Sequence, residues 1–437
     1  MERAKLIVKN FGPLKDIDIE VREMVTFIGA QASGKSTLAK LLSIFEDDNF
    51  RKDDSISFKD ELKKYNIHSY LKSNTFISYD NINYFEKSPF SFKYTEELFT
   101  KATAQRFLSV IKNFEEKEKR NLQRLIKDSV SGDLFECYIN NETLFTTLFF
   151  NENQKNKFNS SLKNEKVNSK LLIDIVLDVL EKDQKVESYI DLLERCIILF
   201  PSLYLFDSLY IPAERNFIHL IAENTLGLIN NNIQIPKHLL NSGQDYEKAI
   251  QTIKELPLTI IDKKLQYKRE GKASYIYHNK TEKVDLLESA SGLQSVIPIL
   301  LLVEYSKSLK GEYNFNFVVE EPELNLYPKA QHELIKYLVK NCLLDRKNLI
   351  LTTHSPFVLA SINNLLLAYD KGQSKPKEVN KIIKKDSWLN PKNFIAYQLK
   401  NGKAYKIMDD KLGQIKENMI DIISDDFSNE FDKLLNL

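Results

Sequence analysis

Alternating apolar and polar positions open the chain. Residues 5–21, KLIVKNFGPLKDIDIEV, predict two strands joined by a Phe-Gly-Pro turn, since apolar side chains recur at every second position. Residues 24–29, MVTFIG, predict a short buried strand that ends in glycine. From residue 36 the apolar positions change to helical spacing, and one face of the predicted helix carries Leu38, Leu41, Leu42 and Phe45.

Further strand and helix patterns follow in the second half of the chain. Apolar runs at 315–319 and 349–353 predict two buried strands, and LYIPAERNF predicts a strand that ends at Pro212. Between them, a helix is expected over about 293–308. Buried strands that alternate with helices predict an α/β fold.

Two hairpins and a short tail complete the pattern. Residues 262–288 contain KLQYKR, a Gly-Lys turn, SYIYH and KVDLLES, which predict a β-hairpin. A second hairpin is predicted in NFIAYQLKNGKAYKIMDD, with its turn at Asn401-Gly402. The segment SNEFDKLLNL predicts a helical tail.

Residues 51–200 have helical periodicity and are nearly free of glycine and proline, which predicts a compact helical insertion. The domain boundaries expected from this pattern are 1–50, 51–200 and 201–437. The insertion could provide dimer contacts or a partner surface, or it could be a scaffold without a binding role. One predicted apolar stripe comprises Phe107, Leu108, Ile111, Phe114, Leu122, Leu125 and Ile126.

Composition limits the class of protein. A chain of 437 residues with 43% apolar content can form a large soluble core. No apolar run approaches the length of a membrane span, and the N-terminus lacks an export signal, so no membrane association is expected. The widely separated Cys137, Cys196 and Cys342 have no metal-binding spacing and indicate free thiols. We therefore expect a cytoplasmic protein.

The formal net charge is only +1, but basic residues gather in two segments. Residues 371–385 hold six lysines against one glutamate, and residues 262–283 carry seven basic residues against three acidic ones. Both segments could bind nucleic acid, with Tyr267, Tyr275 and Tyr277 stacking on bases. A solvated lysine surface and cross-strand tyrosine packing are the alternatives.

The strongest motif lies between the first buried strand and the first helix. Residues 29–36 have the phosphate-binding pattern G-x-x-x-x-G-K-S, and a Gly-Ser turn with an exposed lysine is the alternative. Backbone N–H groups and the helix N-terminus would surround the phosphates. Lys35 would reach the outer phosphates, and the Ser36 hydroxyl would bind Mg²⁺. The predicted nucleotide-binding residues are Gly29, Ala30, Gln31, Ala32, Ser33, Gly34, Lys35, Ser36 and Thr37.

Two adjacent carboxylates follow the apolar run 315–319. Such a pair at the end of a buried strand is costly unless it is solvated or holds a metal, and a surface turn is the alternative. Glu320 is predicted to orient Mg²⁺ or its water shell, and Glu321 to act as general base for the attacking water. His354, after the next strand, is predicted to contact the γ-phosphate, although a lone histidine is commonly structural.

A second anion site is predicted at the start of the helix over 293–308. Ser291 and Gly292 lie at its N-terminus, where N–H groups and the helix dipole favour phosphate. A serine that merely caps the helix is the alternative. The position of this segment shortly before Glu320 favours the phosphate site.

In order, GAQASGKST, SASGLQS, VVEEPELNLYP and TTHSP match Walker A, signature, Walker B with D-loop, and H-loop motifs. With these motifs the chain resembles ABC-type ATPases of the SMC/RecF/OLD branch. It is similar to ATPase subunits of bacterial anti-phage systems such as Septu, PARIS and retron-associated systems. The resemblance implies an α/β ABC-type ATPase head, a mixed sheet with a P-loop, interrupted by the helical insertion. It also implies ATP and Mg²⁺ as cofactors.

The resemblance further implies a head-to-tail homodimer or a higher oligomer. Two ATP molecules would lie between Lys35 of one head and Ser291 and Gly292 of the other, with residues 323–326 crossing the interface as the D-loop. Leu293 stands where the family has a second glycine. A Q-loop glutamine is not evident; residues 214–215 could fill that role, or Arg215 could form a core salt bridge.

Two hypotheses follow for the output of ATP hydrolysis. OLD nucleases carry a C-terminal Toprim metal site, whereas Asp409-Asp410 here lies in a polar segment, so this chain is not expected to be a nuclease. The first hypothesis is a dimeric ATPase that regulates a separate effector, such as a nuclease, in anti-phage defence. The second is a RecF-like DNA-binding protein in repair or replication, and a transporter ATPase is a distant third.

Overall fold

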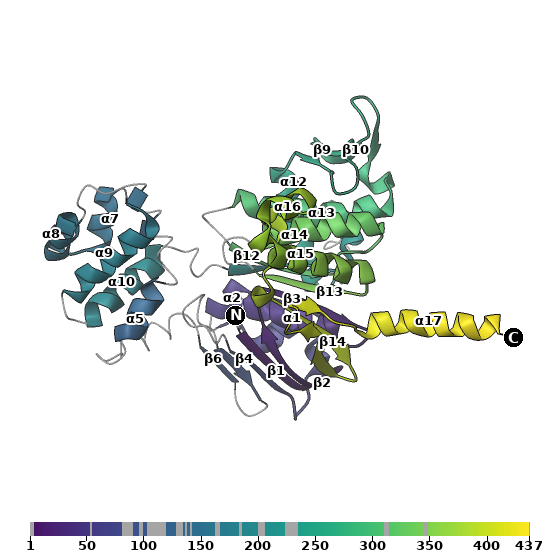
Figure 1. The fold of residues 1–437 in the computed structure, drawn as a ribbon, viewed down its shortest axis with the longest axis horizontal. Coiled ribbons are helices and arrows are strands. Elements are labelled where there is room, and N and C mark those ends of the chain that lie inside the picture. The colour runs from purple at the N-terminus through teal and green to yellow at the C-terminus, as the bar shows by residue number, and fades with distance from the viewer. Residues whose placement is uncertain are drawn as a thin grey trace.

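The fold is described from a computed structural model. It describes residues 4–52, 55–80, 91–95, 99–102, 119–127, 134–135, 138–139, 142–161, 167–182, 186–199, 206–222, 235–309, 314–343 and 348–436. A mixed sheet and flanking helices form the body of the molecule (Figure 1). The predicted α/β class, with a mixed sheet and a P-loop, is confirmed.

The main sheet has eleven strands in the order β6-β5-β4-β1-β2-β15-β14-β3-β13-β12-β7. From β14 to β7 neighbouring strands are parallel, whereas β1, β2 and β4 to β6 form an antiparallel extension. The strands are β1 (Ala4–Phe11), β2 (Leu14–Val21), β3 (Met24–Gly29), β4 (Phe76–Asp80), β5 (Ser91–Tyr94), β6 (Phe99–Ala102), β7 (Phe206–Ile211), β12 (Asn314–Glu320), β13 (Leu349–Thr353), β14 (Phe394–Lys400) and β15 (Lys403–Lys406).

Burial of the strands explains their sequence patterns. All residues of β3 and β13 are buried, because parallel strands in the centre of a sheet are covered on both faces. β2 alternates between buried and exposed residues, as the opening pattern of the chain predicts. The predicted N-terminal hairpin is confirmed by the antiparallel pairing of β1 with β2.

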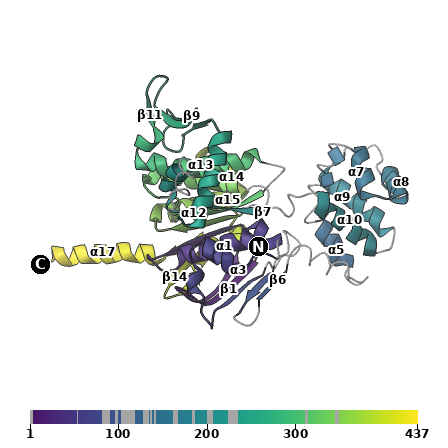
Figure 2. The ribbon, with the colours of Figure 1, turned by 180° about the vertical axis from the view of Figure 1, so that it is seen from behind.

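Helices lie on both sides of this sheet. The helix α1 (Lys35–Glu46) packs against β7, β12 and β13. Figures 1 and 2 both show a second group of helices on the other side of the parallel strands. This group comprises α12 (Lys237–Thr252), α13 (Ser291–Ser308), α14 (Pro328–Cys342), α15 (Pro356–Ser374) and α16 (Pro376–Ile382).

A buried carboxylate fastens α1 to the sheet. Glu46 is fully buried and accepts hydrogen bonds from the Tyr79 hydroxyl at 2.6 Å and the Asn316 amide at 2.5 Å. The Arg51 guanidinium lies 3.0 Å away and balances its charge. A buried charge needs such partners, so this network stabilises the junction of α1 with β4 and β12.

The prediction of a helical insertion over 51–200 is wrong for residues 76–80, 91–94 and 99–102. Strands β4, β5 and β6 lie there and extend the main sheet from β1. Short helices α2 (Asp48–Lys52) and α3 (Phe58–Lys64) precede them. β4 reads FISYD, whose aromatic and β-branched residues favour a strand once β1 offers an edge.

The helical part of the insertion begins later and has its own hydrophobic core. Leu122 and Ile126 of the predicted stripe belong to that core, whereas residues 103–118 lie outside the described residues. The helices with described bounds are α5 (Lys119–Leu125), α7 (Glu142–Phe149), α8 (Glu152–Ser161), α9 (Ser169–Glu181) and α10 (Val186–Leu199).

Both predicted hairpins are confirmed, the one within residues 262–288 and the one that turns at Asn401-Gly402. Strands β8 (Glu255–Pro257), β9 (Gln266–Glu270), β10 (Ala273–Tyr277) and β11 (Lys283–Asp285) form a separate sheet. β14 and β15 turn at Asn401 and Gly402, which both have positive φ. The strands β16 (Met408–Asp409) and β17 (Gln414–Ile415) pair next, and the helical tail, α17 (Met419–Leu435), is longer than predicted.

The tyrosines of the β9–β10 hairpin are engaged within it. Tyr267 is buried, and its hydroxyl lies 3.0 Å from that of Ser274. The Lys283 ammonium sits 3.9 Å from the centre of the Tyr275 ring and also pairs with Glu270. These contacts favour cross-strand packing over base stacking.

Candidate functional site

Three adjacent parallel strands bring the predicted site residues to one edge of the sheet. β3 pairs with β13 and β13 with β12, in a register that sets Thr353 beside Ile28 and Glu320 beside Thr352. The residues that follow each strand therefore emerge side by side. In α/β proteins this carboxyl edge of the sheet is where ligands bind.

The loop between β3 and α1 is folded around its own lysine. Lys35 is buried, and its ammonium donates to the carbonyl oxygens of Gly29 and Ala30, both at 2.9 Å. Ala32 and Gly34 have φ values of 59° and 101°. Such positive φ angles turn successive backbone N–H groups toward one concavity, which is how phosphate-binding loops are built.

The charge of Lys35 faces three carboxylates. Burial lowers the pKa of Lys35, whereas the nearby Glu321, Glu320 and Glu323 raise it. Because the lysine is held by neutral carbonyl oxygens in this structure, its charge remains available for the phosphates of a nucleotide. This position is consistent with the predicted role of Lys35 at the outer phosphates.

Glu320 has the features expected of a metal-orienting carboxylate. Burial raises the pKa of Glu320, while Lys40 and the hydroxyls of Tyr210 and Ser36 lower it. Its Oε1 atom is buried and has no hydrogen-bond partner among the described residues. A buried carboxylate oxygen without a partner, next to a hydroxyl, fits a hard cation such as Mg²⁺.

The protein offers few direct ligands for that cation. No cluster of three or more His, Cys, Asp or Glu side chains within the described ranges is arranged to hold a metal. Mg²⁺ commonly retains water and binds substrate phosphates alongside one or two protein groups. Ser36 and Glu320 are consistent with a site of this kind.

The Glu321 and His354 side chains lie together. The Nε2 atom of His354 is 3.3 Å from Oε1 of Glu321, and both side chains are partly exposed. The Glu321 N–H donates to the Thr352 carbonyl at 2.9 Å, and Glu321 has a φ of 44°. A non-glycine residue in this conformation is strained, and such strain concentrates at functional sites.

Glu323 positions the backbone beside His354, a role that the sequence did not reveal. Its Oε1 accepts from the Thr353 hydroxyl at 2.8 Å and from the His354 N–H at 2.7 Å. Burial raises the pKa of Glu323, while the hydrogen bond from the His354 N–H lowers it. The side chain predicted to belong to a D-loop across a dimer interface thus contacts its own chain.

Arg215 joins three parts of the site through backbone carbonyls. It lies in the 3₁₀ turn Arg215–Phe217 (η5) after β7 and is fully buried. Its guanidinium donates to the carbonyls of Glu320 and Glu321 at 2.8 Å, and to Ser295 on α13 at 2.9 Å. Burial lowers the pKa of Arg215 to about 10, so the side chain remains charged at neutral pH.

This arrangement revises the expectations for residues 214–215. Arg215 lies in the core, but its hydrogen-bond partners are carbonyl oxygens, and it forms no salt bridge in the described part of the chain. Glu214 is exposed, and its charge contributes to the raised pKa of Glu320. Glu214 therefore stays the Q-loop candidate of the pair.

The predicted signature residues occupy the N-terminus of α13. Ser291 is exposed, and Ala290 rather than a serine precedes the helix, with no side-chain cap. The serine-cap alternative is therefore wrong for this helix. The next residue, Gly292, packs closely on the loop after β12, because a Cβ atom there would lie 2.6 Å from the Asn325 carbonyl oxygen.

The close approach at Gly292 leads to a testable expectation. Gly292→Ala should lower the free energy of unfolding by about 1–3 kcal/mol, since backbone would have to move to accept the methyl group. Ser291→Ala, at an exposed neighbouring position, should leave it unchanged. Thermal unfolding of both variants measures this difference, and a Gly292→Ala protein as stable as wild type would contradict the close packing.

Asp409 and Asp410, the adjacent aspartates near residue 410, make local contacts. The Asp409 carboxylate accepts from the N–H groups of Lys411 and Leu412 in a turn, and Asp410 pairs with Lys406 at 2.6 Å. Both carboxyl groups have lowered pKa values, for which hydrogen bonds are the main cause. These contacts explain both aspartates as local structural groups.

The loop after β3, the buried Glu320 and the adjacent Glu321–His354 pair lie together at one edge of the sheet. Residues 1–359 match the family described as AAA ATPase domain, and the chain belongs to this family. No curated protein matches the chain.

Solved structures of SMC head domains are similar to this chain at a low level. The SMC head domain from Thermotoga maritima is 11% identical, with 93% of this chain and 98% of that chain covered and a TM-score of 0.36. The Smc head domain derived from Pyrococcus furiosus, bound to the C-terminal domain of ScpA, is 12% identical, with coverages of 92% and 95% and a TM-score of 0.35. The family membership rests on the sequence match, because TM-scores of this size carry no structural argument.

Across the part of the chain that the structure describes, no helix combines the length and the apolar character needed to cross a membrane.

Proposed function

We propose that this protein is an ATP-hydrolysing switch that works as a head-to-tail dimer and controls a separate protein effector. The observation that carries the ATPase assignment is the convergence of Lys35, Glu320 and the Glu321–His354 pair at the edge formed by β3, β12 and β13. Mg²⁺, when bound, would neutralise charge on the phosphates.

Each residue has a defined task in this proposal. Lys35 exchanges its loop carbonyls for phosphate oxygens when nucleotide enters. Ser36 and Glu320 hold the cation or its water shell, and Glu321 accepts a proton from the attacking water. His354 lies within contact distance of Glu321 and orients that water near the γ-phosphate. Arg215 and Glu323 hold the backbone on which these groups stand.

The dimer proposal rests on the signature segment. Ser291 begins an 18-residue helix, is exposed, and has no side-chain cap beside it. Such a helix N-terminus presents free N–H groups and a partial positive charge, which suits the phosphates of a nucleotide bound to a second copy. ATP binding would then close two heads around two nucleotides.

The effector proposal rests on the resemblance to anti-phage ATPases and on the reaction centres found in the described residues. The described residues hold one reaction centre, and the C-terminal aspartates are used in local structure. An ATP-driven change between open and closed heads would have to be read by another molecule, such as a nuclease.

Affinity purification of the tagged protein from its native host tests this proposal. Mass spectrometry should identify a stoichiometric partner protein, and the partner should dissociate or change activity when ATP is added. Recovery of DNA alone, released by salt, would contradict the effector proposal and support the RecF-like alternative.

The DNA-binding alternative is favoured by one observation. Lys381, Lys384 and Lys385 are exposed and have no carboxylate partner in the described residues. If they bind duplex DNA, affinity should fall steeply with salt and be lost in the triple glutamate variant. Unchanged DNA affinity in that variant would remove this alternative.

A further inference from the structure

The C-terminal helix α17 is firmly attached at one end and uncovered along the rest. The Met419 N–H donates to Oε1 of Gln398 at 2.7 Å, and Asn418 and Asp421 form a capping box. Ile420 still packs against the main core. Beyond it, every side chain described from Asp421 to Asn436 is exposed, and the helix extends away from the body (Figures 1 and 2).

One face of α17 is apolar. Because a helix turns once in 3.6 residues, Ile423, Phe427, Phe431 and Leu434 line up along its axis; we call these four residues the apolar stripe. The exposed fractions of Phe427 and Phe431 are 66% and 62%. Covering a row of large apolar side chains stabilises the helix that carries them. A lone helix of this length is only marginally stable in water. The stripe therefore indicates a docking surface.

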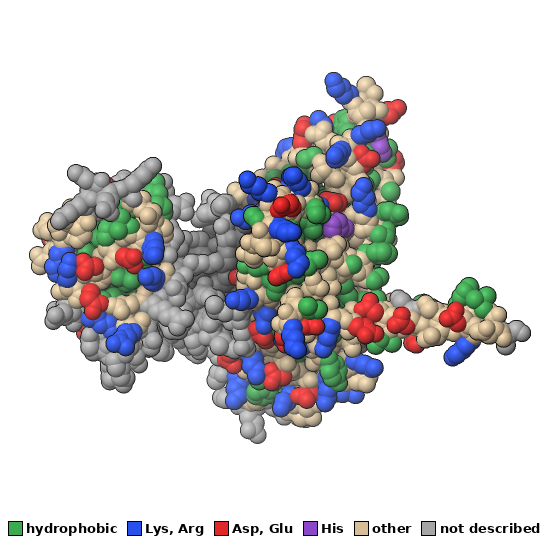
Figure 3. All heavy atoms as spheres, viewed as in Figure 1, with side chains coloured by type: hydrophobic (Ala, Val, Ile, Leu, Met, Phe, Trp, Pro, Cys, Tyr) green, Lys and Arg blue, Asp and Glu red, His purple; other side chains and the backbone are tan. Residues whose placement is uncertain are grey.

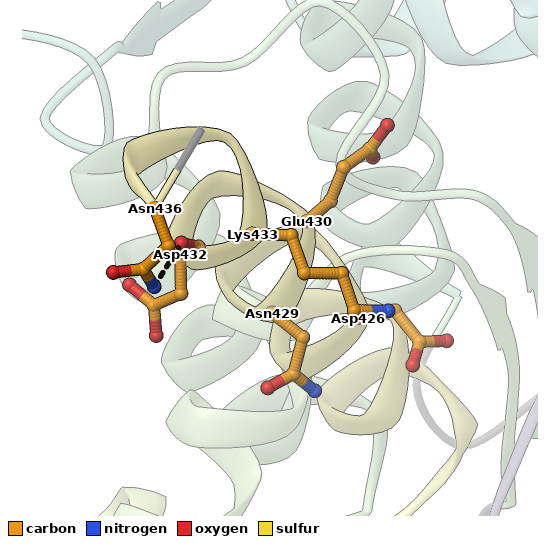
Figure 4. Close-up of a pocket in the computed structure, with 6 residues that line it drawn as sticks. All are labelled: Asp426, Asn429, Glu430, Asp432, Lys433 and Asn436. Atoms are coloured by element: carbon orange, nitrogen blue, oxygen red, sulfur yellow. Dashed lines mark hydrogen bonds between the residues drawn. The ribbon is translucent and has the colours of Figure 1, made fainter.

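The rest of α17 is acidic. It carries five carboxylates, those of Asp421, Asp425, Asp426, Glu430 and Asp432, against Lys433, a net charge of −4. Figure 4 shows Asp426 and Glu430 pointing outward from the helix. The hollow beside them is lined by residues of α17 and by Asn436, which directly follows the helix, so it is an open surface rather than an enclosed site. A partner for this helix should be basic.

The end of α15 and the helix α16 carry such a basic surface. Figure 3 shows Lys and Arg side chains gathered there. Ile382 is 81% exposed among them. Trp388 packs on Gly372 and donates to the Ile383 carbonyl at 2.9 Å, which holds the segment in place. Exposed lysines without a carboxylate partner in the described residues form what we call the lysine patch: Lys375, Lys377, Lys381, Lys384 and Lys385.

We propose that α17 of one copy docks on the lysine patch of a second copy. The apolar stripe would cover Ile382, and the carboxylates of the helix would meet the lysines. The same chain cannot supply this contact, because its α17 points away from its own α16. Pairing of two α17 helices would instead bring together two charges of −4. A reciprocal exchange of α17 between two copies closes the assembly.

The apolar part of the contact is tested by self-association of the full chain without nucleotide, measured by sedimentation velocity. Phe427→Asp should weaken self-association by about thirty-fold, as loss of an interface hot spot does. Ile422→Asp is the matched control, because Ile422 is also exposed but lies on the opposite side of the helix. Equal effects of the two substitutions, or a wild-type chain that stays monomeric, would overturn the proposal.

The contact between the α17 carboxylates and the lysine patch is tested by charge-reversal substitutions on each side. Glu430→Lys with Asp426→Lys should weaken assembly, because both carboxylates flank the apolar stripe. Lys381→Glu with Lys384→Glu should weaken it as well. Both sets combined in one chain should restore it. If the lysine variant remains assembled, α17 has another partner, and if it loses DNA binding alone, the patch serves nucleic acid. Either result would overturn the proposal, whatever the outcome for ATP hydrolysis.

Discussion

Glu321→Gln is expected to reduce kcat for ATP hydrolysis by about 10²–10⁴-fold, the usual contribution of a general base. The amide has nearly the same shape, so nucleotide binding should remain. ATP-bound protein should accumulate in the closed dimer, which size-exclusion chromatography in the presence of ATP would detect. Turnover of radiolabelled ATP under single-turnover conditions measures the chemical step itself.

The geometry at Glu321 explains this expectation. Its carboxylate lies 3.3 Å from His354, and its backbone is held in a strained conformation by the Thr352 carbonyl. The Glu321 carboxylate is thus held, partly exposed, at the edge of the sheet where β3, β12 and β13 end. Substitution to glutamine removes the proton acceptor and keeps this placement.

Two controls make the result specific. Lys35→Ala should bind ATP poorly from the start, because the loop then lacks its charge for the outer phosphates. Glu323→Gln should alter the backbone beside His354 and leave the general base in place, so its kcat should fall less than that of Glu321→Gln. Normal hydrolysis by Glu321→Gln would show that another group accepts the proton.

Arg215→Met is expected to lower both the stability and the kcat of the protein. It leaves the carbonyls of Ser295, Glu320 and Glu321 without their buried donor. Each unsatisfied buried group costs about 1–3 kcal/mol, so the free energy of unfolding should fall by about 3 kcal/mol or more. Chemical denaturation measures this loss.

A separate readout shows whether Arg215 also positions the catalytic groups. Arg215→Lys keeps the positive charge, but a lysine ammonium lacks the rigid, planar set of donors with which arginine binds three carbonyl oxygens. At a temperature where it is folded, its kcat should fall at least tenfold while its affinity for ATP is retained. Arg22→Met is the matched control, because Arg22 donates to the Phe394 carbonyl far from the site. If both variants lose stability and keep normal kcat, Arg215 is structural only.

The parts of the site that follow from local sequence were predictable. The phosphate loop, the strand before it and the helix after it are fixed by neighbouring residues and by the special φ angles at Ala32 and Gly34. The turn at Asn401-Gly402 was predictable for the same reason. The acids at 320 and 321 were found because a long apolar run directly precedes them.

The parts that depend on distant contacts were not predictable. β4 is a strand because β1, some seventy residues earlier in the chain, offers it an edge. Arg215 and Glu323 bind backbone groups of other elements, and no sequence pattern marks such partners. The available signal was an arginine shortly after a predicted strand, but whether its side chain binds carboxylates or carbonyl oxygens depends on the fold.

Subunit complementation tests the central claim, that ATP is hydrolysed at sites shared between two heads. Lys35→Ala removes the phosphate-loop charge, and Ser291→Arg blocks the signature segment, so each variant alone should be inactive. In a mixed dimer, the intact Lys35 of one copy meets the intact Ser291 of the other, and one site is restored. The account predicts that mixing the two inactive proteins restores ATP hydrolysis. A mixture that forms dimers and stays inactive would contradict it.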